Sequence, residues 1–248
     1  MCTHCGCSTD KARLSELADS TETQVINLQQ DPSTVHMQQS LLAGNDAIAQ
    51  NNRQQFSENK ITCINLMGTP GAGKTQLIET LLSRSDSLSQ NMAVLEGDQE
   101  TSNDAARIEA AGGKVLQINT GTGCHLDAEM IDAGVNALAD SSFSLLMIEN
   151  VGNLVCPALF DLGESARIAI MAVTDGEDKP IKYPHMFSQC DLVLINKSDL
   201  LPYVDFDLKR VKHDLSHLNP GCPVLAISAK TGEGIESLES WLKDNHYG

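Results

Sequence analysis

The chain has 248 residues, with 17 Lys and Arg against 33 Asp and Glu and a formal net charge of −16 at pH 7. A surface that binds nucleic acid or an anionic membrane needs a basic face, which this balance does not favour, so we expect no nucleic-acid partner. No apolar run approaches the roughly 18 residues of a membrane span, and the amino terminus lacks the basic and apolar segments of an export signal. We therefore expect a cytoplasmic protein whose eight cysteines are thiols or metal ligands rather than disulfides.

The first 32 residues contain three closely spaced cysteines, Cys2, Cys5 and Cys7, and then a polar stretch that extends to about residue 31. If Met1 is removed, the α-amine of Cys2 joins the three thiolates and gives four donors of the kind that Ni²⁺, Zn²⁺ and Cu⁺ accept. The polar stretch is rich in Ser, Thr, Glu and Gln and is typical of a flexible tether. We expect residues 1–32 to form a metal-binding tail, and the alternative is a terminus whose cysteines have no role.

Residues 33–59 form a second segment, in which apolar residues recur at helical spacing with helix formers between them. Gly44 and Asn45 are candidates for a break, so the pattern predicts one or two amphipathic helices. Such a helix packs on the main domain or pairs with another chain, and packing within its own chain is the commoner role.

The main domain spans residues 60–248, where short apolar runs alternate with helical stretches. Runs of this length and composition are typical of parallel strands that are buried on both faces. The alternation predicts an α/β fold with a doubly wound, mostly parallel sheet that has helices on both faces. The predicted strands are Ile61–Met67, Met92–Leu95, Val115–Ile118, Leu145–Ile148, Ile168–Val173, Leu192–Ile195 and Val224–Ile227.

The segment after the first strand, GTPGAGKT, matches the phosphate-binding loop pattern G-x-x-x-x-G-K-[S/T]. Its glycines let the backbone curl so that N–H groups point at phosphate oxygens, with the positive end of the following helix behind them. Lys74 supplies a charge for the β- and γ-phosphates, and the Thr75 hydroxyl is placed to bind Mg²⁺. The pattern predicts a P-loop NTPase, whereas a Gly-rich turn without a ligand is the weaker alternative. Phosphate binding is assigned to Gly68, Gly71, Ala72, Gly73, Lys74 and Thr75.

Carboxylates follow the second and fourth predicted strands, at the edge of the sheet where a doubly wound fold binds its ligands. Glu96-Gly97-Asp98 follows the second strand, and Glu149 follows the fourth, with Gly152 three residues later. We expect Asp98 and Glu149 to hold Mg²⁺ or order the attacking water, and the Gly152 N–H to contact the γ-phosphate. Each acid alone is more often a solvated residue or a helix cap. With the phosphate loop present, Lys74, Asp98 and Glu149 become the candidate catalytic residues.

A guanine-recognition motif follows the sixth strand, where Asn196, Lys197 and Asp199 stand in the run NKSD. The Asp199 carboxylate can accept from the N1–H and the exocyclic amine of guanine, and adenine cannot donate that pair of hydrogen bonds. Lys197 covers the base with its aliphatic stem, and Asn196 ties neighbouring loops together. After the seventh strand, a backbone N–H of Ser228, Ala229 or Lys230 is placed to reach the guanine O6 atom. The nucleotide is therefore predicted to be GTP.

Two further stretches are independent of nucleotide chemistry but lie on the same face, namely Cys124-His125 after the third strand and Cys156-Pro157 after the fourth. Two thiolates and an imidazole are ligands that Zn²⁺ and Ni²⁺ accept, with a position left for water, another residue or a second chain. The alternative is that the cysteines are small buried hydrophobic residues, and this is our interpretation of Cys63, Cys190 and Cys222.

Taken together, these motifs resemble the HypB family of hydrogenase nickel-incorporation GTPases, over essentially all of residues 60–248 and at the extreme amino terminus. The resemblance implies a P-loop GTPase that forms a homodimer promoted by GTP or metal. It also implies delivery of Ni²⁺ to the precursor of the [NiFe]-hydrogenase large subunit, with a HypA-type chaperone as partner. Ni²⁺ or Zn²⁺ binding is carried onto Cys124, His125 and Cys156, and separately onto the tail cysteines. The motifs are Gly68–Thr75, Glu96–Asp98, Gly121–His125, Glu149–Pro157, Asn196–Asp199, Ser228–Lys230 and Cys2, Cys5 and Cys7.

Two departures narrow what the resemblance implies. Some members of the family store nickel on a histidine-rich segment, and the urease-activating relative has a Cys-Pro-His run, and this chain has neither. We therefore expect a metallochaperone that couples GTP hydrolysis to nickel insertion. The alternatives are a nickel or zinc store whose assembly is controlled by nucleotide, a urease-type nickel GTPase, and a P-loop kinase for a small molecule. No arginine finger is assigned, and Arg107 and Arg167 have no predicted role.

Overall fold

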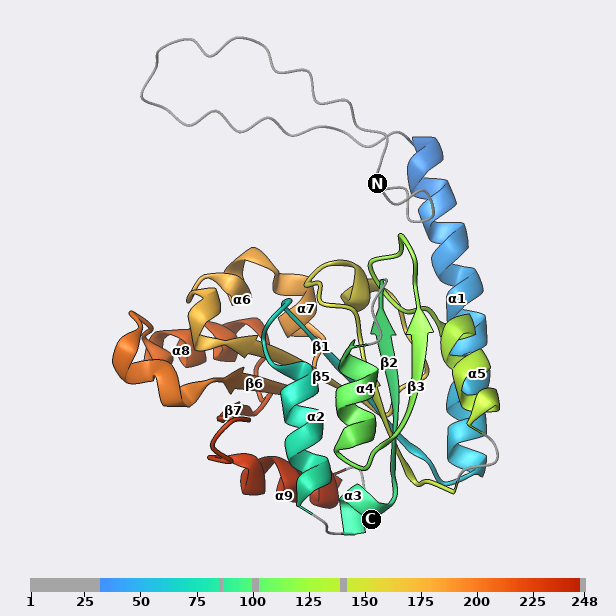
Figure 1. Ribbon diagram of the computed structural model, residues 1–248. Coiled ribbons are helices and arrows are strands. Elements are labelled where there is room, and N and C mark those ends of the chain that lie inside the picture. The colour runs from blue at the N-terminus through green and yellow to red at the C-terminus, as the bar shows by residue number, and fades with distance from the viewer. Residues whose placement is uncertain (1–31, 85–86, 100–102, 139–141, 246–248) are drawn as a thin grey trace.

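The computed structural model describes residues 32–84, 87–99, 103–138 and 142–245, so the predictions for Cys2, Cys5 and Cys7 lie outside the described residues. The described chain forms a sheet of seven parallel strands in the order β3-β2-β4-β1-β5-β6-β7, with helices on both faces (Figure 1). The predicted α/β fold with a doubly wound sheet is therefore confirmed. β1, which leads into the phosphate loop, lies in the centre of the sheet between β4 and β5.

Each predicted apolar run coincides with one strand, and the differences lie at the strand ends. The largest is in β2, which continues to Asp98 instead of ending at Leu95, so that Glu96 is a strand residue. Every residue of β4 and β6 is buried, as expected for strands that are covered on both faces. The strands are β1 Thr62–Gly68, β2 Met92–Asp98, β3 Lys114–Asn119, β4 Leu145–Glu149, β5 Ala166–Ala172, β6 Leu192–Asn196 and β7 Val224–Ala226.

The helices divide between the two faces of the sheet because alternate strand residues point to opposite sides. α2, α3, α4 and α9 contribute residues such as Leu77, Ile108 and Leu238 to the core on one face. α1 and α5 pack on the other face near β2 and β4, while α7 and α8 cover that face near β5 and β6. The helices are α1 Pro32–Glu58, α2 Lys74–Ser83, α3 Ser87–Gln90, α4 Asn103–Ala110, α5 Ala128–Ala137, α6 Lys179–Lys182, α7 Pro184–Ser188, α8 Leu208–Leu218 and α9 Ile235–Asn245.

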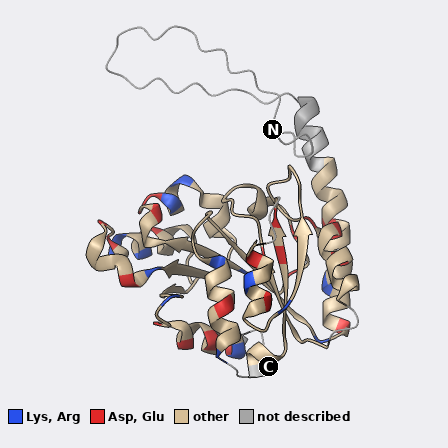
Figure 2. Cartoon of the chain, in the orientation of Figure 1, with Lys and Arg blue, Asp and Glu red and all other residues tan. Residues whose placement is uncertain are grey.

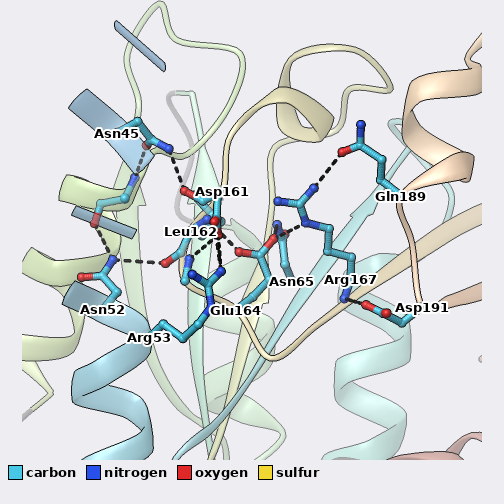
Figure 3. Close-up of polar contacts among 12 residues, drawn as sticks. Asn45, Asn52, Arg53, Asn65, Asp161, Leu162, Glu164, Arg167, Gln189 and Asp191 are labelled. Carbon is cyan, nitrogen blue, oxygen red and sulfur yellow. Dashed lines mark hydrogen bonds and ion pairs between the residues drawn. The ribbon is translucent and has the colours of Figure 1, made fainter. Parts of the chain in front are cut away.

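The first helix, α1, is continuous over 27 residues, so the break considered at Gly44 and Asn45 is wrong. Gly44 is exposed, where a glycine costs a helix only about 1 kcal/mol relative to alanine. Asn45 is buried, and its side chain accepts from Ala128 N at 2.9 Å and donates to Asp161 O at 2.8 Å (Figure 3). The first contact attaches α1 to the start of α5 and the second attaches it to the loop before β5, and Figure 1 shows α1 and α5 side by side.

Charged residues of both signs are distributed over the helices, and acidic residues also occur along β2 (Figure 2). This places carboxylates within the sheet itself, near the end of β2 at which a ligand is expected. No helix in the described part of the chain has the length and apolar character needed to cross a membrane.

Candidate functional site

The phosphate loop connects β1 to α2 and places its lysine at one end of the sheet. β1 ends at Gly68 and α2 begins at Lys74, so the loop amides lie in front of a helix amino terminus, where a phosphate is favoured. Gly73 has a φ of 94°, which lets the chain turn directly into α2. Lys74 is 7% exposed, and its Nζ lies 3.3 Å from Thr69 O. Burial lowers the pKa of Lys74, and the Glu149 carboxylate opposes that shift.

Two glutamates stand next to each other at the same end of the sheet. Glu96 of β2 and Glu149 of β4 are partners in register, so their side chains lie on the same face. Thr75 Oγ1 donates to Glu149 Oε1 at 2.8 Å. The Oε2 atoms of both glutamates are buried and have no hydrogen-bond partner among the described residues. Buried carboxylate oxygens beside a Thr hydroxyl form a donor set that fits Mg²⁺.

The ionisation of these glutamates reflects their surroundings. Burial, followed by the negative charges of Glu149 and Asp98, raises the pKa of Glu96 to about 8. Burial also raises the pKa of Glu149 to about 7, although Lys74 and the hydrogen bond from Thr75 oppose the shift. A cation between the two carboxylates would remove the cost of ionising them both, which is the second reason that Mg²⁺ fits this position.

Away from the two glutamates, hydrogen bonds join the phosphate loop, the Asn196–Asp199 motif and the Ser228–Lys230 segment. The Asn196 side chain, at the end of β6, donates to Ala72 O at 2.7 Å and accepts from Ala229 N at 3.0 Å. Asp199 Oδ1 accepts from Ser228 Oγ at 2.6 Å. Asn196 is 2% exposed and Ser228 is fully buried, so these contacts order the loops without a ligand. The predicted tying role of Asn196 matches this arrangement.

The three amides considered for guanine O6 are not equivalent. Ser228 N donates to Glu233 O at 2.9 Å, and Ala229 N is used by Asn196. Within the described residues, Lys230 N is the one amide of the three to which no acceptor is assigned. Of these three backbone N–H groups, that of Lys230 therefore remains the candidate donor to guanine O6.

A cavity of about 740 Å³ lies between the phosphate loop and the Asn196–Asp199 motif. This volume falls in the range of small-molecule and cofactor sites. Gly68, Ala72 and Ser228, although predicted to bind nucleotide, do not line it and instead support the residues that do. The predicted residues that line the cavity are Gly71, Gly73, Lys74, Thr75, Asp98, Glu149, Gly152, Asn196, Lys197, Asp199, Ala229 and Lys230.

The predicted metal ligands Cys124, His125 and Cys156 come together in a second cluster. Each contributes one donor atom, and the three atoms lie within 4.8 Å of one another. Cys124 Sγ is 2.9 Å from Cys156 Sγ and 3.7 Å from His125 Nδ1. Cys124 and His125 converge although they are consecutive, because they lie in the irregular loop between β3 and α5. Two sulfurs and an imidazole this close together form a ligand set that Zn²⁺ and Ni²⁺ accept.

The surroundings of this cluster favour the metal-binding form of its histidine. The His125 ring stacks on Phe160 with centroids 3.9 Å apart, and burial lowers the pKa of His125 against the opposing charge of Asp127. A lowered pKa keeps the imidazole neutral, which is the form that binds a metal. Cys156 begins a short 3₁₀ helix that ends at Leu159, and Leu159 and the preceding Val155 are 49% and 51% exposed.

The segment that connects the two sites is short. Glu149, Asn150, Val151 and Gly152 line the nucleotide cavity, and Cys156 follows four residues after Gly152. The backbone of Asn153 also pairs with Gly68 at the start of the phosphate loop. The nucleotide cavity and the metal cluster therefore share one stretch of backbone.

Sequence analysis placed Glu96 in the carboxylate pair after the second strand but gave an individual role to Asp98 alone, because the importance of Glu96 depends on the strand order. β2 lies beside β4, and this order brings Glu96 next to Glu149 although 53 residues separate them in the chain. The signal in the sequence was that Glu96 directly follows the apolar run Met92–Leu95. If the predicted strand is extended by one residue, Glu96 becomes part of the sheet and can lie beside a residue of a neighbouring strand.

The two unassigned arginines have different positions. Arg107 lines the nucleotide cavity, and its guanidinium binds Glu79 at 2.8 Å and Asp104 at 3.0 Å. Arg167 lies outside the cavity lining and binds Glu164 at 2.6 Å (Figure 3). Arg107 is therefore the one of the two that lies beside the phosphate region.

Comparison with known protein families gives one match to most of this domain. The family model described as the nucleotide-binding domain of CobW/HypB/UreG matches residues 62–226. The hydrogenase maturation factor HypB of Rhizobium leguminosarum bv. viciae is 48% identical over 210 residues, which cover 84% of this chain and 70% of that protein. The protein named hydrogenase/urease maturation factor HypB from Helicobacter pylori is 35% identical over 224 residues, with 87% and 91% covered.

Two solved structures resemble most of this chain. The crystal structure of HypB from Helicobacter pylori in complex with nickel has a TM-score of 0.76 and 34% identity, covering 82% of this chain and 97% of that one. The crystal structure of HypB from Archaeoglobus fulgidus has a TM-score of 0.75 and 38% identity, with 82% and 98% covered.

Proposed function

The chain belongs to the CobW/HypB/UreG family, as a relative of the hydrogenase maturation factors HypB, and from this premise we propose that it is a GTP-hydrolysing nickel metallochaperone. The observation that carries the proposal is the shared segment from Glu149 to Cys156. One end of this segment lies in a nucleotide-sized cavity, and the other supplies a ligand to a two-cysteine, one-histidine cluster.

The nucleotide of this proposal is GTP. Asp199 lies in the cavity wall, where its carboxylate accepts the two donors of a guanine edge, and Lys197 lies beside it. Thr75, Asp98 and Glu149 would hold Mg²⁺, which supplies positive charge to the phosphates when bound. The buried Oε2 atoms of Glu96 and Glu149, which have no hydrogen-bond partner in the described part of the chain, support this assignment.

Hydrolysis requires that the chain neutralises the phosphates and orders a water molecule. Lys74 and the loop amides perform the first task, and Asp98 or Glu149 performs the second. The arginine that lines the cavity, Arg107, is held by Glu79 and Asp104. We therefore expect slow intrinsic turnover that a partner accelerates.

Nickel is the proposed cargo of Cys124, His125 and Cys156, and Zn²⁺ is a second ion that the same ligands accept. The relative from Helicobacter pylori was crystallised in complex with nickel, which supports this choice. The tail cysteines Cys2, Cys5 and Cys7 remain a proposed second metal site.

The proposed partners follow from the same family. A second copy of the chain is the partner that we assign to the exposed Val155 and Leu159 beside Cys156, and GTP or metal promotes this homodimer. A HypA-type nickel chaperone and the precursor of the hydrogenase large subunit complete the delivery route, which we place in the cytoplasm. Urease is the second candidate target, because the Helicobacter relatives are named for both enzymes.

The test uses full-length protein in which the three tail cysteines are replaced by serine, so that only the cluster contributes. Ni²⁺ and Zn²⁺ are titrated with GDP and with a non-hydrolysable GTP analogue, and phosphate release from GTP is measured separately. Linked sites typically change affinity by about 5–150-fold, so we expect a ratio in this range between the two nucleotide states.

Two cysteine variants control this titration. Cys156→Ser should abolish binding at the cluster, whereas Cys222→Ser replaces a half-buried thiol outside the cluster and should leave binding intact. Equal metal affinity in both nucleotide states for both ions, or no phosphate release from GTP, would overturn the proposed function.

A further inference from the structure

Two asparagines of the segment after Glu149 contact the loop that carries Cys124 and His125. Asn150 Oδ1 accepts from Leu126 N at 3.3 Å, directly after His125. Asn153 Nδ2 donates to Cys124 O at 3.4 Å, directly before His125. The loop is therefore held on both sides of its histidine, and we call this pair of hydrogen bonds the asparagine clasp.

Both asparagines of the clasp are also connected to the phosphate end of the nucleotide cavity. Asn150 follows Glu149 in the chain, and its Oδ1 also accepts from Val151 N at 2.9 Å, within the cavity lining. Asn153 pairs through its backbone with Gly68. A displacement of this segment toward or away from the phosphates is therefore transmitted to the Cys124 loop through two side chains.

Behind the clasp, a buried polar chain fixes Asn150 to the body of the sheet. Asn150 Nδ2 donates to Asn65 Oδ1 at 3.2 Å, and Asn65 Nδ2 donates to Glu164 Oε1 at 3.2 Å. The same Glu164 oxygen accepts from Arg167 Nε at 2.6 Å, and Figure 3 shows this end of the chain. Asn65, Asn150 and Glu164 are each less than 10% exposed, so this anchor lies in the core and restricts Asn150 to small movements.

The two clasp hydrogen bonds are longer than the bond that joins Asn150 to Val151. At 3.3 and 3.4 Å they exceed the usual range of 2.7–3.2 Å for N–H···O bonds, whereas the anchoring bond to Val151 N does not. We therefore expect a movement of the Glu149–Asn153 segment to strengthen or weaken these two hydrogen bonds. Their loss removes two hydrogen bonds between the loop that carries Cys124 and the segment that carries Cys156.

We propose that Asn150 and Asn153 are positioning residues that couple nucleotide state to metal affinity, by setting whether Cys124 and His125 are held against the segment that carries Cys156. This inference rests on the proposed function and specifies how its two sites communicate. Neither asparagine is a metal ligand or touches the reacting phosphate in this scheme. Their effect is therefore expected in the ratio of metal affinities between nucleotide states, rather than in the presence of either site.

The experiment measures Ni²⁺ affinity with GDP and with a non-hydrolysable GTP analogue, in full-length protein with the tail cysteines replaced by serine. In protein that keeps both asparagines, the Ni²⁺ affinities in the two nucleotide states should differ by about 5–150-fold. Asn153→Ala and Asn150→Ala should each reduce the ratio severalfold, and the double variant should bring it within about twofold of unity. Asn153 is half-buried, so its variant remains informative if the buried Asn150→Ala does not fold.

Asn219→Ala is the matched control. Asn219 also makes two hydrogen bonds from its side chain, to the backbone carbonyls of Phe187 and Cys190, but far along the sheet from both sites. It should lower the free energy of unfolding as an asparagine substitution does and keep the parent ratio. A clasp variant that keeps the parent ratio would overturn the inference and leave the proposed function standing. A parent ratio of one would overturn both.

A second measurement needs no substitution in the clasp. Hydrogen exchange of the Leu126 amide, which donates to Asn150, should change at least fivefold when the GTP analogue replaces GDP. The Asn219 side of the sheet provides the internal reference, where the amide of Asn219 donates to Leu215 O and should not respond. An unchanged Leu126 rate in protein whose nickel affinity does respond to nucleotide would contradict the role of the clasp.

Discussion

The two ends of the nucleotide cavity differ in how far their polar groups are satisfied without a ligand. At the base end, Asn196 and Asp199 exchange hydrogen bonds of 2.6–3.0 Å with neighbouring loops. At the phosphate end, Glu96 and Glu149 each bury an oxygen that has no partner among the described residues. The pKa values of both glutamates are raised, and that of Lys74 is lowered.

This difference indicates that the two ends have different tasks. Groups that are already hydrogen-bonded lose little freedom on binding, so the base end can select guanine without rearrangement. Buried groups without partners are stabilised by an incoming ion or phosphate, so the phosphate end changes most when nucleotide and Mg²⁺ arrive. The conformational response is therefore expected at the end that leads to Cys156.

The largest expected effect tests the base end. Asp199→Asn removes the acceptor of the guanine N1–H and amine pair, and GTP affinity should fall by a few kcal/mol, roughly 100-fold, while XTP affinity rises. The asparagine Oδ1 can still accept from Ser228 Oγ, so the free energy of unfolding should change little. Competition among ATP, GTP and XTP measures the selectivity. ATP binding as tightly as GTP in the parent protein would contradict guanine recognition.

A pair of glycine substitutions tests whether the hydrogen bond from Asn196 to the phosphate loop orders the base end of the cavity. A Cβ at Gly73 would lie 2.5 Å from Asn196 Nδ2, whereas a Cβ at Gly71 would have no atom within 4 Å, and both have positive φ. Gly71→Ala should cost about 1 kcal/mol for the left-handed conformation. Gly73→Ala should cost about 2–4 kcal/mol, because it also displaces the Asn196 hydrogen bond. Urea unfolding without nucleotide compares them, and equal losses would show that Asn196 does not order the base end.

A smaller effect tests the phosphate end through pH. The pKa of Glu96 is about 8 in the folded chain and near 4.3 in the unfolded one, so the folded state holds more protons between these values. Ionisation therefore opposes folding, and the parent should lose stability as pH rises toward 8. Glu96→Gln removes this titration and should lose about 1 kcal/mol less between pH 6 and pH 8, a figure reduced for solvent screening at the cavity.

The measurement is urea unfolding at both pH values, without nucleotide or divalent cation. Glu149 titrates in both proteins, so the difference between them reports Glu96 together with its electrostatic interaction with Glu149. Parallel pH dependence in the parent and in Glu96→Gln would mean that the Glu96 carboxyl is not held in its neutral form.

The smallest expected effect on turnover concerns the tail. Replacement of Cys2, Cys5 and Cys7 by serine should remove one metal equivalent and leave GTP turnover within about twofold of the parent, if these cysteines form the separate metal site that the sequence predicts. Equilibrium dialysis and phosphate release provide the two readouts. A loss of turnover that matches the loss of metal would indicate that the tail docks on the cavity.

The sequence alone determined the strands and the phosphate loop. Strands that are buried on both faces appear in the sequence as short apolar runs, which can be recognised without a structure. The GTPGAGKT loop is a local pattern, because its residues are neighbours both in the chain and in space. The base-recognition residues Asn196 and Asp199 were also identified, because they follow directly from a strand end. Local chemistry made these features predictable.

Only the tertiary structure decided which distant residues meet. Composition and spacing did not show that β2 lies beside β4, and this order alone buries Glu96 next to Glu149. It likewise took the folded chain to bring Cys124 within 2.9 Å of Cys156, and to place Asn150 and Asn153 against the loop that carries His125. Such contacts depend on the packing of strands and loops that are far apart in the sequence. The spacing of apolar residues indicates local helices and strands but does not show which of them pack together.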